Sequence, residues 1–164
     1  MTEVANLFGA SADTGANFGS EIYPGYPGLV VAEGRARTMT WGFPLVLKGK
    51  SGQPLKPKPA NNARTDKLDS FMWRFSFQER HCLIPVSAWA EAQGSKGVMT
   101  RTWPSLPGGE PFAVAGVWCA TAEGSDADAM VMSDCCELTA DIHERILVLL
   151  SVSDWERVDP RFAG

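Results

Sequence analysis

The sequence has few of the residues that usually build metal sites. It contains only two histidines, and its four cysteines include no Cys-x-x-Cys pair. The cysteines are Cys82, Cys119, Cys135 and Cys136. We therefore expect no metal site and no other cofactor, and we expect free thiols in a reducing compartment.

Long hydrophobic runs are also missing. No apolar segment approaches the ~20 residues that a membrane-spanning helix needs. The stretch Met1–Ala10 lacks the basic start and the long apolar core of a signal peptide. We expect a cytoplasmic monomer with no membrane partner.

An excess of positive charge is absent as well, since the net charge is −4 and the isoelectric point about 5.2. This sign is wrong for a protein that coats nucleic acid non-specifically. Positive residues nevertheless cluster over Lys48–Lys58 and over Arg74–His81. A local patch of this kind is enough for a few phosphate contacts.

Glycine and proline, the residues most typical of turns, are abundant in the sequence. Sixteen glycines and eleven prolines in 164 residues predict many short elements rather than a helical bundle. Hydrophobic periodicity predicts a hairpin of Leu29–Ala32 and Arg35–Trp41, and further strands at Cys82–Ala88, Val98–Trp103, Phe112–Ala120, Ala129–Ser133 and Ile146–Leu150. Helices are predicted at Met1–Phe8 and Thr65–Phe77, a short helix or turn at Ala140–Arg145, and a last helix capped by Ser153 and Glu156. Lys48–Pro59 is predicted to be a surface loop. Together these elements predict one α+β domain over residues 1–164, with a β-rich core and peripheral short helices.

Polar residues that interrupt apolar surroundings are the candidates for chemistry. Glu91 follows the apolar run that ends at Trp89, where partial desolvation would raise its pKa and suit it to proton transfer. From the pattern alone, a surface Glu where the strand ends is the more common interpretation. His143 precedes the apolar strand Ile146–Leu150 and suits acid–base work, although a lone His is more often structural.

Asn62 and Arg64 follow the proline-rich loop. Asn can orient a substrate by donor and acceptor, and the Arg guanidinium can hold a phosphate. The alternative is a turn Asn and a salt-bridged Arg. Cys82 is a further candidate, as the nucleophile of a thiol hydrolase, but it lies in an apolar run where a structural thiol is expected.

Five short motifs occur in a fixed order along most of the chain. They are Trp41-Gly42-Phe43-Pro44, Asn62-Ala63-Arg64, Arg80-His81-Cys82-Leu83-Ile84-Pro85 with Glu91 six residues after the Pro, Ala115-Gly116-Val117-Trp118, and Asp141-Ile142-His143-Glu144-Arg145. In this series the chain resembles the SRAP domain, the SOS response-associated peptidase family. The resemblance implies a barrel-like core.

The resemblance also implies a function. Proteins of this family capture abasic sites in single-stranded or gapped DNA through a cysteine that directly follows the initiator Met, which they remove themselves. The cysteine amine and thiol close on the abasic aldehyde as a thiazolidine cross-link. By motif match, Asn62 would position that cysteine, Glu91 would shuttle protons, and His143 would bind near the sugar or phosphate. Arg64, with Arg74 from the second basic cluster, would contact DNA, and Trp41 would stack on unpaired bases. Localisation would be cytoplasmic, with association to the nucleoid on damaged DNA.

The N-terminus departs from the family pattern. Residue 2 is Thr2, no cysteine precedes Cys82, and Met1–Phe8 resembles the helix that normally follows the missing opening. We therefore expect the chain as printed to be inactive in cross-linking, and a longer form that begins Met-Cys to carry the activity. The alternative is a DNA-binding module without chemistry.

Overall fold

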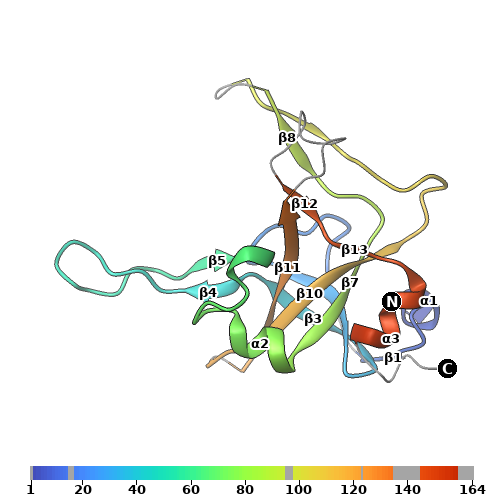
Figure 1. Cartoon of the computed structure of the whole chain (residues 1–164), viewed down its shortest axis with the longest axis horizontal. Coiled ribbons are helices and arrows are strands. Elements are labelled where there is room, and N and C mark those ends of the chain that lie inside the picture. Colours follow the sequence, from blue (N-terminus) through green and yellow to red (C-terminus); the bar gives the residue numbers. More distant parts are fainter. Residues whose placement is uncertain (1, 15–16, 95–97, 123, 135–144, 159–164) are drawn as a thin grey trace.

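The centre of the fold is a barrel of five hydrogen-bonded strands (Figure 1). The computed structural model describes residues 2–14, 17–94, 98–122, 124–134 and 145–158. Around the barrel the strands follow the order β3-β2-β7-β10-β11, and a parallel pairing of β11 with β3 closes the ring. The barrel strands are β2 (Pro27–Ala32), β3 (Arg35–Trp41), β7 (His81–Val86), β10 (Phe112–Ala120) and β11 (Asp126–Asp134). Closure leaves these strands no free edge.

Short elements surround the barrel. Four strands extend its sheet: β1 (Ser11–Ala12), β6 (Asn62–Arg64), β12 (Arg145–Leu147) and β13 (Leu149–Leu150). Two separate ladders pair β4 (Phe43–Leu45) with β5 (Lys58–Ala60), and β8 (Glu91–Gln93) with β9 (Thr100–Thr102). The helices are α1 (Thr2–Leu7), a 3-10 turn η1 (Thr65–Lys67), α2 (Arg74–Glu79) and α3 (Val152–Val158). The α+β prediction, with a β-rich barrel and peripheral short helices, is therefore confirmed.

The first barrel hairpin forms where the sequence predicts it. Glu33 and Gly34, which join β2 to β3, have φ angles of 56° and 69°. Both residues lie in the left-handed region that a type I′ turn requires, and this turn matches the twist of the two strands.

Side chains alternate between the two faces of each barrel strand, so the buried residues form one set inside the barrel and another set outside it. Val30, Met39, Ile84 and Val114 belong to one buried cluster that fills the barrel interior. Neighbouring residues of the same strands point outward, and the helices cover them. Because both faces are covered, β10 is buried along almost its whole length, which explains its continuous apolar sequence.

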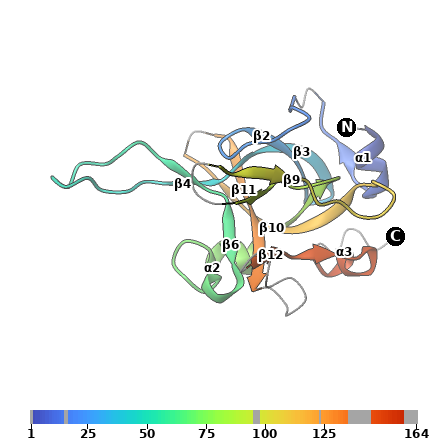
Figure 2. The ribbon, with the colours of Figure 1, turned by 90° about the horizontal axis from the view of Figure 1, so that it is seen from above.

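The outer face is covered from two sides. Helices α1 and α3 pack on it through Phe8 and Trp155, whose rings stack with centroids 4.3 Å apart. On another side, the segment that contains η1 and α2 packs Leu68 and Trp73 over β11. Both views place α1 and α3 at the opposite end of the molecule from a long projection (Figure 2).

That projection, residues 43–60, is called the arm below. It consists of β4, β5 and the chain between them, and it carries four lysines and no acidic residue. A glycine makes its base possible. Gly42 has a φ of 122°, and a Cβ there would lie 2.4 Å from the Cβ of Pro59.

Several predicted boundaries differ from the structure, and four of the differences change an element, its partner or its cap. The loop Lys48–Pro59 ends in strand β5, because Lys58 and Pro59 pair with β4. The helix at Thr65–Phe77 is divided, and only Arg74–Glu79 is α-helical. The strand Ile146–Leu150 changes partner at Val148, with β12 on β11 and β13 on β10.

The fourth difference is at the last helix. It begins at Val152, so Ser153 lies inside it and cannot cap it. Ser151 precedes the helix instead, and its hydroxyl donates a 2.6 Å hydrogen bond to Asp154. The predicted helix or turn at Ala140–Arg145 lies outside the described residues, except for Arg145, which begins β12.

Candidate functional site

A cavity of about 520 Å³ opens at one end of the barrel. Its floor is made of interior core residues, including Val30, Ile84 and Leu147. Its walls come from residues 18–24 and from the segment that runs from Pro85 to Glu91. The volume lies within the ~300–1,000 Å³ that is usual for small-molecule sites.

Glu91 lies on the wall of this cavity. Its side chain is half buried, and its Oε1 accepts a 2.8 Å hydrogen bond from the indole Nε1 of Trp89. Trp89 is itself held edge-on against Phe112, with ring centroids 5.9 Å apart. A core aromatic pair therefore fixes the orientation of the carboxylate.

Asn62 and Trp41 line the same cavity from two other strands. Both strands run parallel to β11: Trp41 lies opposite Asp128, and Asn62 lies opposite Met130. The indole Nε1 of Trp41 donates a 3.2 Å hydrogen bond to the backbone oxygen of Asn61, which ties the two segments together. Residues from separate motifs of the series thus face one cavity only through the closure of the barrel.

Asp128 is a cavity residue that the sequence analysis did not find. It is only 2% exposed, and its Oδ1 has no hydrogen-bond partner among the described residues. Burial raises the pKa of this carboxyl well above its usual range, opposed in part by a hydrogen bond from its own backbone N–H. A signal was present, because Asp128 interrupts the apolar run of β11, but the predicted strand began one residue after it.

Arg101 is a second cavity residue missed from the sequence. It comes from the exposed strand β9, and its guanidinium carbon lies 5.9 Å from the ring centroid of Tyr23, another lining residue. No sequence pattern marks it, since only the β8–β9 hairpin brings it to the cavity.

The other predicted site residues are not in the lining. Arg64 forms two 2.7 Å hydrogen bonds to the carboxylate of Asp66, which lowers the pKa of that carboxyl. Arg74 begins α2 and is exposed. His143 lies outside the described residues. The phosphate-binding roles of the two arginines stay predictions.

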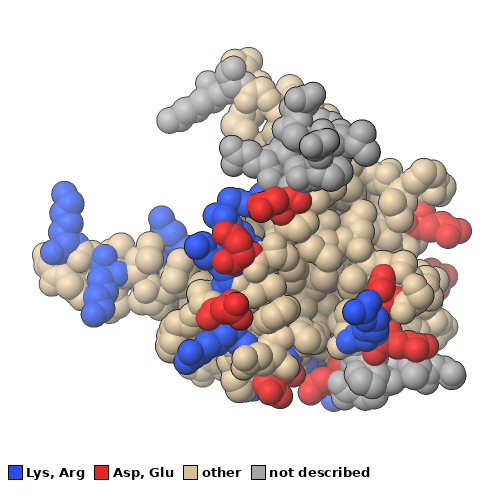
Figure 3. All heavy atoms as spheres, viewed as in Figure 1, with Lys and Arg blue, Asp and Glu red and all other residues tan. Residues whose placement is uncertain are grey.

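Positive charge is unevenly spread over the surface. Blue side chains follow the arm in Figure 3, whereas the body mixes both signs. The four arm lysines are Lys48, Lys50, Lys56 and Lys58. The first predicted basic cluster therefore projects from the molecule. In the second cluster, Arg80 lies over the rings of Phe75 and Trp118.

Two cysteines are described, and both are free. Cys82 is fully buried inside the barrel and outside the cavity lining, and burial raises its pKa well above the usual value. Burial likewise raises the pKa of Cys119 to about 11. Both thiols are protonated near neutral pH, which does not suit a nucleophile.

Two further features concern the described part of the chain only. It holds no group of three or more His, Cys, Asp or Glu side chains arranged to bind a metal ion. Within those same residues, no helix has both the length and the apolar character needed to cross a bilayer.

Comparison with solved structures shows that the fold is shared. A crystal structure from Bordetella bronchiseptica has a TM-score of 0.75 at 22% identity, over 95% of this chain and 82% of that chain. One from Bacteroides thetaiotaomicron has a TM-score of 0.69 at 14% identity, over 98% and 80%. A phage-related protein from Bordetella bronchiseptica has a TM-score of 0.58 at 21% identity, over 85% and 68%.

Sequence comparison identifies the family. No curated protein matches the chain. Residues 2–158, by contrast, match the family described as SOS response associated peptidase (SRAP). Since this match spans nearly the whole chain, the protein belongs to the SRAP family.

Proposed function

We propose that this protein binds single-stranded or gapped DNA and that a form beginning with Met-Cys cross-links abasic sites. Membership of the SRAP family supports an SOS-associated function in the broad sense. The observation that carries the proposal is the cavity, which gathers Trp41, Asn62 and Glu91 from three separate strands or strand ends.

The position of helix α1 supports entry of an N-terminal cysteine. Val4, in the first turn of α1, lines the cavity. The first turn of α1 therefore lies at the cavity wall, and we expect an N-terminal extension to reach the cavity from there. The cavity is large enough for a cysteine and an opened deoxyribose together.

The chemistry then needs two bond-forming steps. The cysteine α-amine attacks the abasic aldehyde, and loss of water with uptake of one proton gives an iminium. The thiol adds to the iminium carbon, and the thiol proton passes to a nearby base as the thiazolidine closes. In this proposal Glu91 carries the protons and Asn62 holds the cysteine, and the hydrogen bond from Trp89 to Glu91 and the position of both residues in the cavity lining support these roles. We retain His143 as a second proton carrier.

The charge distribution supports DNA binding outside the cavity. The arm supplies four lysines, and Arg64 and Arg74 supply guanidinium groups near one another in the chain. Trp41, half buried at the cavity, offers a ring for an unpaired base. Affinity is expected to be modest and salt-sensitive, because the net charge is −4.

A denaturing gel with single-stranded DNA that carries one abasic site tests the proposal. The printed chain is compared with a form extended at its N-terminus to begin Met-Cys, and with the same extension carrying Ser in place of that Cys. A shifted band with the Cys form alone supports cross-linking. Binding in a native gel without any covalent band would favour the DNA-binding module. A covalent band from the printed chain would mean that the nucleophile lies elsewhere.

A further inference from the structure

Asp128 carries a buried carboxyl oxygen, Oδ1, that no described residue satisfies. Its Oδ1 is buried without a hydrogen bond from any described residue, although unsatisfied buried polar atoms are rare and costly. The residue also lines the cavity. A polar side chain in that state is suited to a group that arrives from outside.

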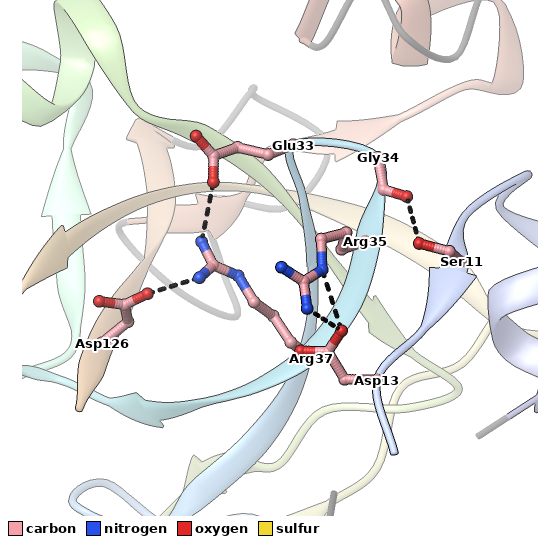
Figure 4. A network of polar contacts seen from close by, with 7 residues as sticks. All are labelled: Ser11, Asp13, Glu33, Gly34, Arg35, Arg37 and Asp126. Atoms are coloured by element: carbon pink, nitrogen blue, oxygen red, sulfur yellow. Dashed lines mark hydrogen bonds and ion pairs between the residues drawn. The ribbon is translucent and has the colours of Figure 1, made fainter. Parts of the chain in front are cut away.

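Arg37, a cation on the neighbouring strand β3, is already engaged. In Figure 4 the guanidinium of Arg37 lies between Glu33 and Asp126 and points to both carboxylates. Its NH1 donates to Asp126 at 2.7 Å and its NH2 to Glu33 at 3.3 Å. The Nε of Arg37 is buried without a partner, as is Oδ1 of Asp128, so these two groups do not satisfy each other. The Cys82 thiol, also close to Asp128, is protonated and brings no charge.

Strand register places Asp128 beside the proposed reaction site. Asn62 lies opposite Met130, and Asp128 is two residues earlier on the same face of β11, about 7 Å along the strand. Trp41 lies directly opposite Asp128. The backbone N–H of Gly42 donates a 2.8 Å hydrogen bond to the carbonyl of Asp128, which fixes this register.

The charge of the lining favours a positive occupant. Asp128, Glu91 and Glu21 contribute three carboxyls, while Arg101, on an exposed strand, is the one Lys or Arg among the described lining residues. A cation that enters would let Asp128 ionise and would gain a charge-assisted hydrogen bond in a poorly solvated place. A neutral polyol would gain no such ion pair.

We propose that Asp128 is a positioning residue whose carboxylate binds the positively charged nitrogen of a primary amine, or of the iminium formed from it, inside the cavity. The identity of that amine as the protein's N-terminal amine rests on the proposed function. The amine site itself does not, because it follows from the unsatisfied Oδ1 of Asp128 and the charge of the lining.

The first test needs no DNA. The carboxyl ¹³C resonance of Asp128 is followed in the printed chain while n-propylammonium chloride is added, with n-propanol plus sodium chloride as the neutral control. The resonance is assigned by its loss in Asp128→Asn. If that variant does not fold, the resonance is assigned through the backbone. Ionisation of Asp128 by the amine alone is the expected result. No change, or the same change with propanol, would overturn the amine site.

The second test uses the Met-Cys form and abasic DNA. Asp128→Asn, which keeps the side-chain shape, should slow cross-linking about 10- to 100-fold, in line with loss of one hydrogen bond to a charged group, and should leave DNA affinity unchanged. Asp126→Asn removes a carboxylate from the same face of the same strand but outside the cavity lining, and it should leave the rate within about threefold of the parent. Equal slowing in both variants would reduce Asp128 to a structural role. If the parent form does not cross-link at all, the proposed function fails, while the resonance of Asp128 still decides the amine site.

Discussion

Trp89 and Glu91 lie two residues apart and are joined side chain to side chain, since the indole Nε1 donates a 2.8 Å hydrogen bond to Glu91 Oε1. Because Trp89 also packs against Phe112, the hydrogen bond connects the barrel core to the cavity wall. The carboxylate is therefore held in one orientation before any substrate enters.

Replacement of Glu91 with Gln tests its role in proton transfer. Gln can still accept the indole hydrogen bond, but it cannot take a proton. In the Met-Cys form we expect cross-linking to slow by about 100-fold, the lower range for a lost general acid–base group, in single-turnover gels. An unchanged rate would remove Glu91 from the chemistry.

Trp89→Phe is the matched control for orientation. It keeps an aromatic ring beside Phe112 and removes the N–H donor. We expect a smaller loss than in Glu91→Gln, about 10-fold, because the carboxylate remains but is no longer held by the indole. A larger loss than in Glu91→Gln would indicate that Trp89 acts through packing rather than through Glu91.

The Arg64–Asp66 ion pair predicts that substitutions of its two members change the affinity for DNA in opposite directions. Asp66 accepts two hydrogen bonds from the Arg64 guanidinium and so competes with a phosphate for it. Asp66→Asn should strengthen binding of single-stranded DNA a few-fold, and Arg64→Ala should weaken it by about 3- to 10-fold. Fluorescence anisotropy at two salt concentrations measures both. If Asp66→Asn weakens binding, the pair supports the local fold rather than competing with DNA.

The arm lysines predict the salt dependence of binding. Replacing Lys48, Lys50, Lys56 and Lys58 with Gln should flatten the plot of log affinity against log salt by about 0.7 for every DNA phosphate that the arm no longer neutralises. Arg157→Gln, on α3 at the opposite end of the molecule, is the control for a surface charge and should leave the slope unchanged (Figure 1). Equal slopes in the parent and both variants would exclude the arm from the DNA interface.

The buried carboxyl of Asp128 predicts how stability depends on pH. Its folded-state pKa lies above the unfolded value of about 3.9, so the folded state binds the extra proton over the interval between them. The stability that this group contributes is full below about pH 3.9 and is lost as pH rises through the folded pKa. Across that interval the free energy of unfolding should fall by up to ~1.4 kcal/mol per pH unit.

Asp128→Asn should abolish that fall. Denaturant titrations from about pH 4 to pH 8 should show a flatter profile for Asp128→Asn than for the parent, and Asp126→Asn should retain the parental slope. Parallel profiles for the parent and Asp128→Asn would show that the carboxyl titrates normally and is not desolvated.

The described thiols predict low reactivity. Iodoacetamide should modify Cys82 and Cys119 at neutral pH much more slowly than it modifies a free thiol with a pKa of about 8.5, because burial keeps both protonated. Peptide mass spectrometry locates the modified sites. Cys82→Ala should leave cross-linking by the Met-Cys form intact. Loss of cross-linking in a variant that still folds would instead support a catalytic role for the Cys82 thiol.

Local sequence determined most of the secondary structure. The Glu33–Gly34 turn places two residues in the left-handed region and so specifies the β2–β3 hairpin. The apolar run Phe112–Ala120 coincides with β10 because hydrophobic residues without alternation need a strand covered on both faces. The motif order, in turn, was sufficient to identify the family.

Tertiary structure decided what local pattern could not. The segment changes partner at Val148 because β12 pairs with β11 and β13 pairs with β10. Hydrophobic periodicity contains no information about which strand a segment pairs with. Asp128 directly precedes the predicted strand Ala129–Ser133. Only barrel closure, through the parallel pairing of β11 with β3, buries it beside Trp41 and aligns it with Asn62. Such long-range pairing depends on the free energy of packing the whole core. The sequence alone was therefore enough to identify the motif residues, whereas only the closed barrel brings them together around one cavity.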